Sequence, residues 1–366
     1  MIGVPQHGRS KLAPLDTQPY ATATGQPKIL RLRAVLRDVL RLAARYLALA
    51  FGVVLINFFL PRLLPGDPLD FSSGDGLDAA VPLTTSARAG LEAYYHLDDP
   101  LLTQLRSYLG DLVRGDLGFS ISRSVPVGDL ILDRLPWTLS LLVVSLLLSA
   151  AIGTAIGMVA GWRPGKRRDR LLMSASGMLA AIPEFLVAIG LLLGGAVGLA
   201  WFPLFGGETV FTDWGGGVSG LAHRALDIAW HLTLPAATLA LAGVAAFVLV
   251  TRDVTAGLQH EPWLVAARAK GLDERQVAIR HALPNMAPPL VTFFGLRLGG
   301  VLSGALVVER VFSIPGLGLL GFQAIGARDY PVLQALFLLS SLGVLLVAFL
   351  VELSYLWFDP ARKAGR

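Results

Sequence analysis

Long blocks of apolar residues alternate with polar and charged segments along most of the chain. A helix needs about 20 apolar residues to cross the hydrocarbon core of a bilayer, and six blocks reach about that length. The pattern therefore predicts an all-α, polytopic membrane protein with about six transmembrane helices. The predicted spans are Ala43–Leu64, Trp137–Gly161, Leu171–Ala200, His231–Thr251, Pro288–Val308 and Val332–Phe358.

The same pattern divides the chain into five parts. Residues 1–40 form a polar N-terminal tail that we expect to be partly disordered, and residues 41–64 carry the first span. Residues 65–136 form the longest segment outside the membrane. Residues 137–358 form a core with the other five spans, the third of which contains Pro183. Residues 359–366 form a short C-terminal tail.

Charge sets the expected orientation. Only 16% of the 366 residues are charged, against about 25% in an ordinary soluble domain. Lys and Arg cluster before the first span, in 163–170, in 252–287 and after the last span. Cytoplasmic loops carry such an excess, so we expect both termini and the 252–287 loop in the cytoplasm and 65–136 in the periplasm. The location expected is a bacterial inner membrane.

Composition also excludes several kinds of site. The chain has no cysteine, which rules out disulfides, Cys-ligated metals and a thiol nucleophile. The net charge of +5 comes from clusters beside the spans, without the aromatic interleaving of a nucleic-acid platform. No histidines stand at metal-motif spacing, and neither a catalytic residue nor a metal site is predicted. Gly316-x-Gly318-x-x-Gly321 matches the dinucleotide fingerprint, but between two spans it is more typical of a glycine-rich turn.

Glycines recur at four-residue intervals inside three spans: Gly153, Gly157 and Gly161; Gly190, Gly194 and Gly198; and Gly295 with Gly299, then Gly300 with Gly304. Small residues at this spacing let helix backbones approach closely in a membrane. They indicate packing within the chain, or, for the fifth span, contact with a partner.

The cytoplasmic loop from Glu261 to Pro284 contains two predicted short helices. Pro262 suits the first position of the first helix and Gly271 its C-terminal cap. Asp273 with Gln276 resembles a capping box, and the second helix is expected to stop at Pro284. The first helix is rich in small and apolar residues, yet it faces the cytosol. Such a helix is typical of one that lies in the groove of a partner protein.

This loop resembles the EAA loop of permeases from binding-protein-dependent ABC importers. The resemblance rests on Ala266-Ala267-Arg268-Ala269-Lys270-Gly271 and on Leu283-Pro284, although Val265 stands where the family has Glu. Further motifs in the family's order include Leu64-Pro65-Gly66-Asp67-Pro68, Val308-Glu309-Arg310-Val311-Phe312, Pro315-Gly316-Leu317-Gly318 and Arg328-Asp329-Tyr330-Pro331. These motifs are typical of the dipeptide, oligopeptide and nickel branch, and the resemblance covers residues 43–362.

The resemblance implies a type I ABC importer permease fold that translocates di- or oligopeptides, with nickel or another small solute as an alternative. It implies four kinds of partner: a second homologous permease, two ATP-binding subunits, a periplasmic or lipid-anchored solute-binding protein, and membrane lipid. The chain has no cofactor of its own, and ATP with Mg²⁺ would bind the partner ATPase. The residues implied in coupling to that ATPase are Leu264, Ala266, Ala267, Arg268, Ala269, Lys270, Gly271, Leu283 and Pro284.

Two charged residues lie inside predicted spans, where charge is costly unless it faces protein or water. Glu184 follows Pro183 in the third span, and Arg297 lies in the fifth. They either hold helices together or line the translocation path.

Two other functions stay open on the sequence alone. An ion-coupled secondary transporter would work without an ATPase and would need more carboxylates in its spans. A membrane-embedded enzyme would need clustered polar residues at one membrane face.

Overall fold

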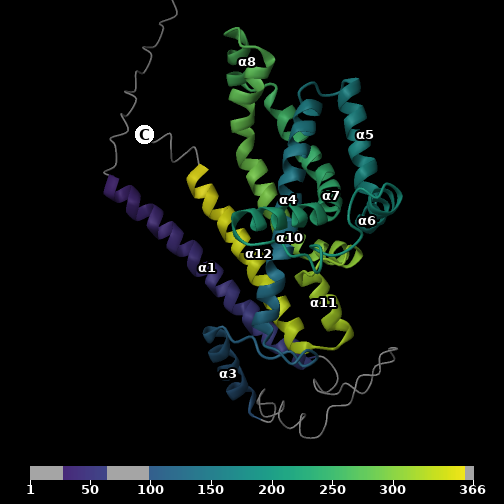
Figure 1. The fold of residues 1–366 in the computed structure, drawn as a ribbon. Helices are drawn as coiled ribbons and strands as arrows, with labels where there is room; N and C mark the ends of the chain where they lie inside the picture. The colour runs from purple at the N-terminus through teal and green to yellow at the C-terminus, as the bar shows by residue number, and fades with distance from the viewer. Residues whose placement is uncertain (1–27, 64–98, 359–366) are drawn as a thin grey trace, which may run out of the picture.

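The chain folds into a helical bundle in the computed structural model, which describes residues 28–63 and 99–358 (Figure 1). Within these residues the only β-type pairing is an isolated bridge between Phe119 and Pro126. The helices are α1 (Lys28–Leu63), α3 (Leu101–Arg114), α4 (Val127–Gly161), α5 (Arg167–Ala181), α6 (Glu184–Leu191), α7 (Gly217–Leu258), α8 (Pro262–Ala269), α9 (Glu274–Gln276), α10 (Leu283–Val311), α11 (Leu317–Gly326) and α12 (Tyr330–Phe358), with π-helical segments η2 (Leu192–Gly198) and η3 (Val277–Ala282).

Four of the described helices are long and apolar enough to cross a membrane: α4, α7, and the segments Leu36–Phe59 of α1 and Tyr330–Ser354 of α12. The pair α5–α6 with η2 makes a fifth if its two arms count as one span. The predicted span Pro288–Val308 lies within α10, of which the side chains of 299–305 are outside the described residues. The all-α prediction is confirmed, with four to five spans among the described residues.

The predicted third span, Leu171–Ala200, is wrong as a single helix. α5 ends at Ala181, α6 starts after Pro183, and the two arms are bent by 91°. Proline has no N–H to donate and disfavours helical geometry in the residue before it. Ile182 is accordingly extended, with φ −81° and ψ 119°. The break brings Glu184 to the first turn of α6.

Several other predicted boundaries differ from the structure. α1 already begins at Lys28, inside the predicted tail, and α4 begins at Val127, inside the segment predicted to lie outside the membrane. α7 begins at Gly217, well before the predicted span His231–Thr251, and α11 forms where a glycine-rich turn was predicted. Residues 1–27, 64–98 and 359–366, with most of the predicted tails, lie outside the described residues.

α4 and α7 share the most extensive helix–helix contact among the described residues, and a seam of glycines on α4 lies within it. A Cβ at Gly157 would lie 2.6 Å from the carbonyl oxygen of Val248 and 2.7 Å from Thr251 Cβ. Gly153 and Gly161 meet α7 in the same way, at Phe247 and at Arg252 with Thr255. The predicted role of this glycine series in packing is confirmed. A Cβ at Gly190 or Gly194 would instead meet open space.

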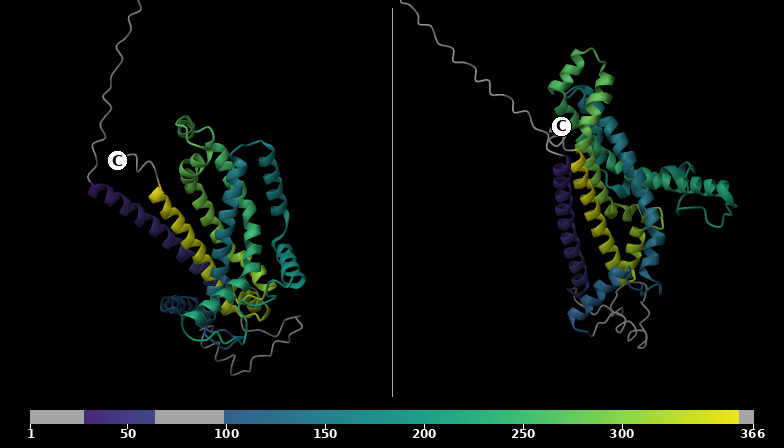
Figure 2. Two further views of the ribbon diagram at one scale, coloured as in Figure 1. Left: turned by 45° about the horizontal axis from the view of Figure 1, so that its top comes forward. Right: turned by 90° about the vertical axis from the view of Figure 1, so that its left-hand side faces the viewer.

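The positively charged segments gather at one end of the bundle. The start of α1, the connection from α4 to α5, α8 and the end of α12 lie at the top in Figure 1, whereas α3 and α11 lie at the bottom. Figure 2 shows that the teal segment around α6 and the start of α7 projects from the side of the bundle. α1 leans on α12, where Tyr46 and Phe349 pack edge to face at 5.5 Å and Arg45 pairs with Glu352.

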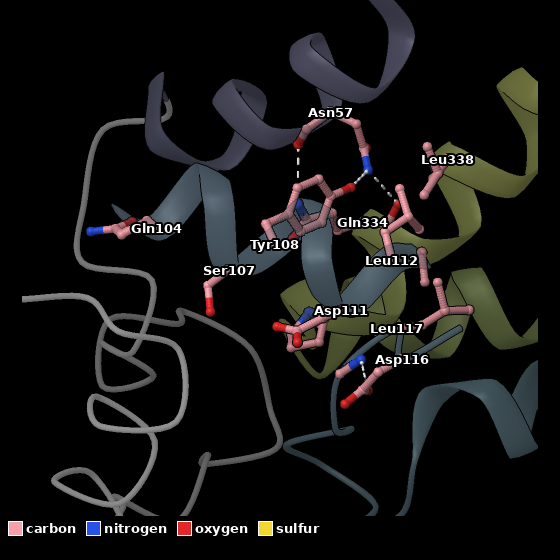
Figure 3. A pocket seen from close by; sticks show the side chains of 13 residues that line it. Asn57, Gln104, Ser107, Tyr108, Asp111, Leu112, Asp116, Leu117, Gln334 and Leu338 are labelled. Carbon is pink, nitrogen blue, oxygen red and sulfur yellow. Dashed lines mark hydrogen bonds between the residues drawn. The ribbon is translucent and has the colours of Figure 1, made fainter. Parts of the chain in front are cut away.

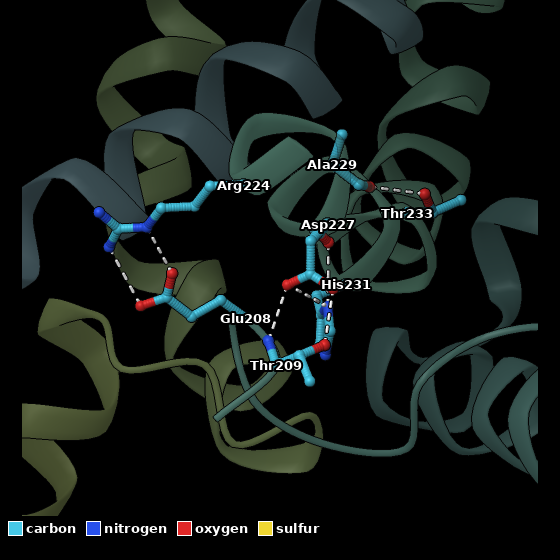
Figure 4. Close-up of polar contacts among 7 residues, drawn as sticks. All are labelled: Glu208, Thr209, Arg224, Asp227, Ala229, His231 and Thr233. Carbon is cyan, nitrogen blue, oxygen red and sulfur yellow. Dashed lines mark hydrogen bonds and ion pairs between the residues drawn. The ribbon is translucent and has the colours of Figure 1, made fainter. Parts of the chain in front are cut away.

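Two polar clusters organise the segments between the spans. In the first, Asn57 of α1 donates to the Tyr108 hydroxyl at 3.1 Å and to the Gln334 carbonyl at 3.2 Å, beside a cavity of about 100 Å³ (Figure 3). In the second, Glu208 pairs with Arg224 at 2.7 Å and the Thr209 hydroxyl donates to Asp227 at 2.6 Å (Figure 4). The contacts of this second cluster fasten the segment before α7 onto α7 itself.

Candidate coupling surface and charged residues in the bundle

α8 has the boundaries that its sequence predicts. Pro262 occupies the first turn, and Gly271 follows the helix with φ +81°, a backbone conformation that disfavours side chains. The Asp273 carboxylate then accepts a hydrogen bond of 2.6 Å from the Gln276 backbone and caps the next helix. Proline, glycine and aspartate thus set the two turns that aim α8.

The two faces of α8 differ. Leu264 and Ala267, 0% and 4% exposed, pack in a core with Val277, Ala282 and Met286. Val265 is 53% exposed, and Ala266, Ala269 and Lys270 are exposed as well. Leu264 and Ala267, which the sequence analysis placed in the coupling set, thus anchor α8 to its own chain, and a direct contact of these two residues with a partner stays a prediction. The accessible face is formed by Val265, Ala266 and Ala269.

A polar network ties α8 to the end of α4. Arg268 Nη2 donates to Gln259 Oε1 at 2.7 Å, and its Nε lies 3.2 Å from Glu274 Oε1. The indole Nε1 of Trp162 donates to Glu274 Oε2 at 2.7 Å, and the Arg268 guanidinium lies 5.6 Å from the Trp162 ring centroid. Arg268 therefore acts inside the loop, and only its partly exposed edge faces outward.

Leu283 and Pro284 do not end a helix, as the sequence predicted, but begin one. η3 runs without interruption into α10, and Pro284 occupies the first turn of that helix. Proline is tolerated there because an N–H in the first turn has no helical partner. Both residues are exposed, so this part of the predicted coupling set lies on the surface.

Glu184 and Arg297 approach each other without pairing. The charge of Arg297 acts on Glu184 across the α6–α10 contact, but no ion pair within 4.0 Å joins them. Glu184 Oε1 and Arg297 Nε are both buried without a hydrogen-bond partner among the described residues. A buried polar atom without a partner is costly, which makes this pair a candidate for a functional role.

Two buried carboxylates escaped the sequence analysis as functional residues. Glu309, 0% exposed, accepts from the Thr138 hydroxyl at 2.7 Å and from the Leu319 backbone at 2.9 Å, which caps α11. Asp329 accepts from the hydroxyls of Ser120 and Ser122 at 2.5 and 2.7 Å. Their motifs Val308–Phe312 and Arg328–Pro331 were the available signal. Both carboxylates hold segments between spans in place.

A third carboxylate joins two helices at the end of the bundle that carries α8. Asp169 of α5 receives Arg252 of α7 through two hydrogen bonds, at 2.8 and 3.1 Å, and the Gly165 backbone at 2.7 Å. Two parallel bonds of this kind fix geometry as well as charge. The loop between α4 and α5 is thereby fastened to α7.

A family comparison agrees with this architecture. The family described as "Binding-protein-dependent transport system inner membrane component" matches residues 153–364, more than half of the chain. The chain belongs to this family. It is thus an inner-membrane component of a transport system, a permease subunit of an ABC importer, and its relatives are transport permeases and not enzymes.

Two relatives span nearly the whole length of the chain. The oligopeptide transport system permease protein AppB of Bacillus subtilis is 32% identical over 88% of this chain and 98% of its own length. The glutathione transport system permease protein GsiC of Escherichia coli K12 is 34% identical over 85% and 94%. A solved structure of the MetNI methionine ABC transporter, inward-facing, is similar at a TM-score of 0.47 and 18% identity over 61% of this chain and 93% of that chain.

Proposed function

We propose that this permease translocates di- or oligopeptides, delivered by an external solute-binding protein, and that a separate ATPase drives it. The support for the substrate class is that relatives at 32% and 34% identity are permeases for oligopeptides and for glutathione, itself a small peptide. The proposed assembly pairs this chain with a second homologous permease and two ATP-binding subunits. ATP with Mg²⁺ would bind those subunits.

The exposed face of α8 is the proposed surface through which the permease couples to the ATP-binding subunit. Val265, Ala266 and Ala269 present small apolar groups to the surface, on a helix whose other face is anchored by Leu264 and Ala267. An anchored helix with a shallow, small-residue edge suits a groove in a partner protein, because nothing bulky blocks close approach. Movement of that partner on binding ATP would shift α8 and the helices joined to it.

The Trp162–Glu274–Arg268 network supports a route for this movement. It joins α8 to α4, and the glycine seam joins α4 to α7. A shift of α8 would therefore move α4 and α7 together and alter the balance between inward- and outward-facing states. In this proposal both termini, the loop between α4 and α5 and α8 lie in the cytoplasm.

Glu184 and Arg297 are the proposed contribution of this chain to the translocation path. They lie at the break between α5 and α6 and on the facing part of α10, with buried polar atoms that no described residue satisfies. Broken helices within a membrane are tolerated where they face protein or water. A peptide with a charged amino and a charged carboxyl terminus offers partners for both side chains.

The experiment is ATP-dependent uptake of a radiolabelled dipeptide into vesicles that hold the reconstituted complex. Uptake should require this chain, the ATPase and the binding protein together, and ATP hydrolysis should rise when the loaded binding protein is added. Uptake that persists without ATPase and follows an ion gradient would overturn the proposal in favour of a secondary transporter.

A further inference from the structure

A basic groove lies beside α8, at the junction of the α4–α5 loop with α9 and η3. Its volume is about 840 Å³. Its lining includes five cationic side chains, Arg163, Lys166, Arg167, Arg168 and Arg275, together with the single carboxylate Glu274. The positive-inside rule accounts for cations on this side of the membrane but not for their collection around one concave surface.

The residues that the structure describes do not neutralise the positive charge of the groove. Glu274 is engaged by Trp162 and Arg268, and the neighbouring Asp169 is turned toward Arg252 and 97% buried. The five cations make no ion pair within 4.0 Å among the described residues. Asp169 lies in the first turn of α5, but its carboxylate is engaged by Arg252 and by the Gly165 backbone.

The groove also has an apolar side that continues onto the spans. Met158, Val159 and Trp162 from the last turns of α4 line it, and Val159 is 56% exposed. Leu171, one turn into α5, is 70% exposed. Four of the five cations, all except Arg275, stand directly after the α4 span and at the start of the α5–α6 pair. In the proposed topology these four lie where lipid headgroups meet the hydrocarbon core.

We infer that this groove binds the phosphate of an anionic phospholipid such as phosphatidylglycerol. Arg163, Lys166, Arg167 and Arg168 would surround the phosphate, and an acyl chain would descend along Val159 and Leu171. Arginine favours phosphate through its planar set of donors, and basic pockets between spans are suited to anionic headgroups. A bound lipid would brace the α4–α5 loop against α9, next to the network that holds α8. The inference does not depend on which solute is transported.

The test measures lipid association with the purified chain in phosphatidylcholine vesicles. The motionally restricted fraction of spin-labelled phosphatidylglycerol is compared with that of spin-labelled phosphatidylcholine by electron paramagnetic resonance. The wild type should retain phosphatidylglycerol preferentially. R168Q should lower that preference about fivefold, and the triple variant K166Q/R167Q/R168Q by up to about 100-fold. R280Q, which removes an exposed cation outside the groove, is the matched control and should keep the preference.

Three outcomes would overturn the inference. The first is an unchanged phosphatidylglycerol preference in the folded triple variant. The second is full displacement of the spin-labelled lipid by inorganic phosphate at constant ionic strength, which would assign the groove to a soluble phosphate compound. The third is a triple variant that keeps its lipid preference but no longer retains the ATPase on purification, which would make the groove a protein interface. Variants are compared only where their thermal unfolding matches the wild type, and R168Q serves alone if the triple variant does not fold.

Discussion

Trp162 donates a hydrogen bond of 2.7 Å to Glu274, and this contact joins the end of α4 to the turn that follows α8. Glu274 also holds Arg268, so one exposed carboxylate connects the candidate coupling helix to a membrane span. Exposed polar pairs contribute little to stability, about 0–1 kcal/mol. We therefore expect this contact to matter less for stability than for geometry, because it links the position of α8 to that of α4.

Replacing Glu274 by Gln should uncouple hydrolysis from transport. The glutamine amide can still accept the hydrogen bond from Trp162, but it carries no negative charge to hold Arg268. Movement of α8 should therefore be transmitted less completely to α4. We expect the number of peptides imported per ATP hydrolysed to fall at least threefold, with abundance unchanged. Uptake and hydrolysis are measured in the same reconstituted vesicles. Asp129→Asn, which changes an exposed carboxylate in the first turn of α4, is the control, and equal ratios for both variants would contradict the role of Glu274.

Ala266→Trp and Ala267→Trp should fail for different reasons. Ala266 is exposed, so tryptophan there should leave thermal stability unchanged while blocking the partner groove and abolishing uptake. Ala267 is 4% exposed, and overpacking its core should lower stability by about 1–3 kcal/mol. The measurements are thermal unfolding of the purified chain and ATP-dependent uptake. Normal uptake by Ala266→Trp would remove α8 as the coupling surface.

Gly157→Ala should destabilise the bundle although alanine favours helices. Its Cβ would lie 2.6 Å from the Val248 carbonyl oxygen, so α4 and α7 must separate. We expect a loss of about 1–3 kcal/mol in detergent unfolding. Gly190→Ala is the matched control, because its Cβ meets open space and it should be neutral or slightly stabilising. Equal stability of the two variants would show that the seam tolerates separation.

Arg297→Leu should reduce uptake by at least tenfold relative to the amount of protein in the membrane. The variant removes a buried charge whose Nε has no partner among the described residues. The double variant Arg297→Leu/Glu184→Leu separates two explanations. If the pair only balances charge between α6 and α10, the double variant should recover uptake, whereas residues that contact the peptide should not be rescued. Uptake that falls in strict proportion to abundance would make Arg297 structural.

Cysteine labelling tests the orientation, since the chain has no cysteine of its own. Phe211→Cys, at a fully exposed position before α7, should react with a membrane-impermeant maleimide in intact cells. Arg280→Cys should react only after the cells are opened, because we place the α8 region in the cytoplasm. The reverse pattern would invert the proposed topology.

Much of the fold follows from local sequence features whose effect does not depend on tertiary packing. Apolar length predicts α4, α7 and α12, and Pro262, Gly271 and Asp273 predict the boundaries of α8 because they act within one turn. The break at Pro183 could not be foreseen with its 91° bend, since proline also occurs inside continuous membrane helices. Whether such a helix kinks or breaks depends on the neighbours that satisfy its freed backbone.

The sequence predicts where α8 begins and ends, but not which of its faces packs against the rest of the chain. The periodicity of an eight-residue helix separates Leu264 and Ala267 from Val265 and Ala266, but it does not say which face meets a partner. Val277 and Met286, which follow α8 in the chain, pack against Leu264 and Ala267 and so bury that face of the helix. Glu309 and Asp329 were undervalued for a similar reason. From the sequence, a carboxylate near the end of a span is expected to face solvent. In the structure, Thr138 contacts Glu309 and Ser120 contacts Asp329, and both partners come from distant parts of the chain.

The glycine seam between α4 and α7 has a consequence for biogenesis. α4 leaves the ribosome well before α7, because α5 and α6 lie between them in the chain. Until α7 is made, the glycine face of α4 is therefore exposed in the bilayer or at the insertion machinery. Ser145 and Ser149, which are buried in the folded protein, are exposed during the same period. Ser149 can donate its hydrogen bond to the Ala240 carbonyl only after α7 has packed against α4. Variants that weaken the seam should therefore lengthen the period in which half-inserted chains are open to membrane proteases, before any solute or nucleotide is involved.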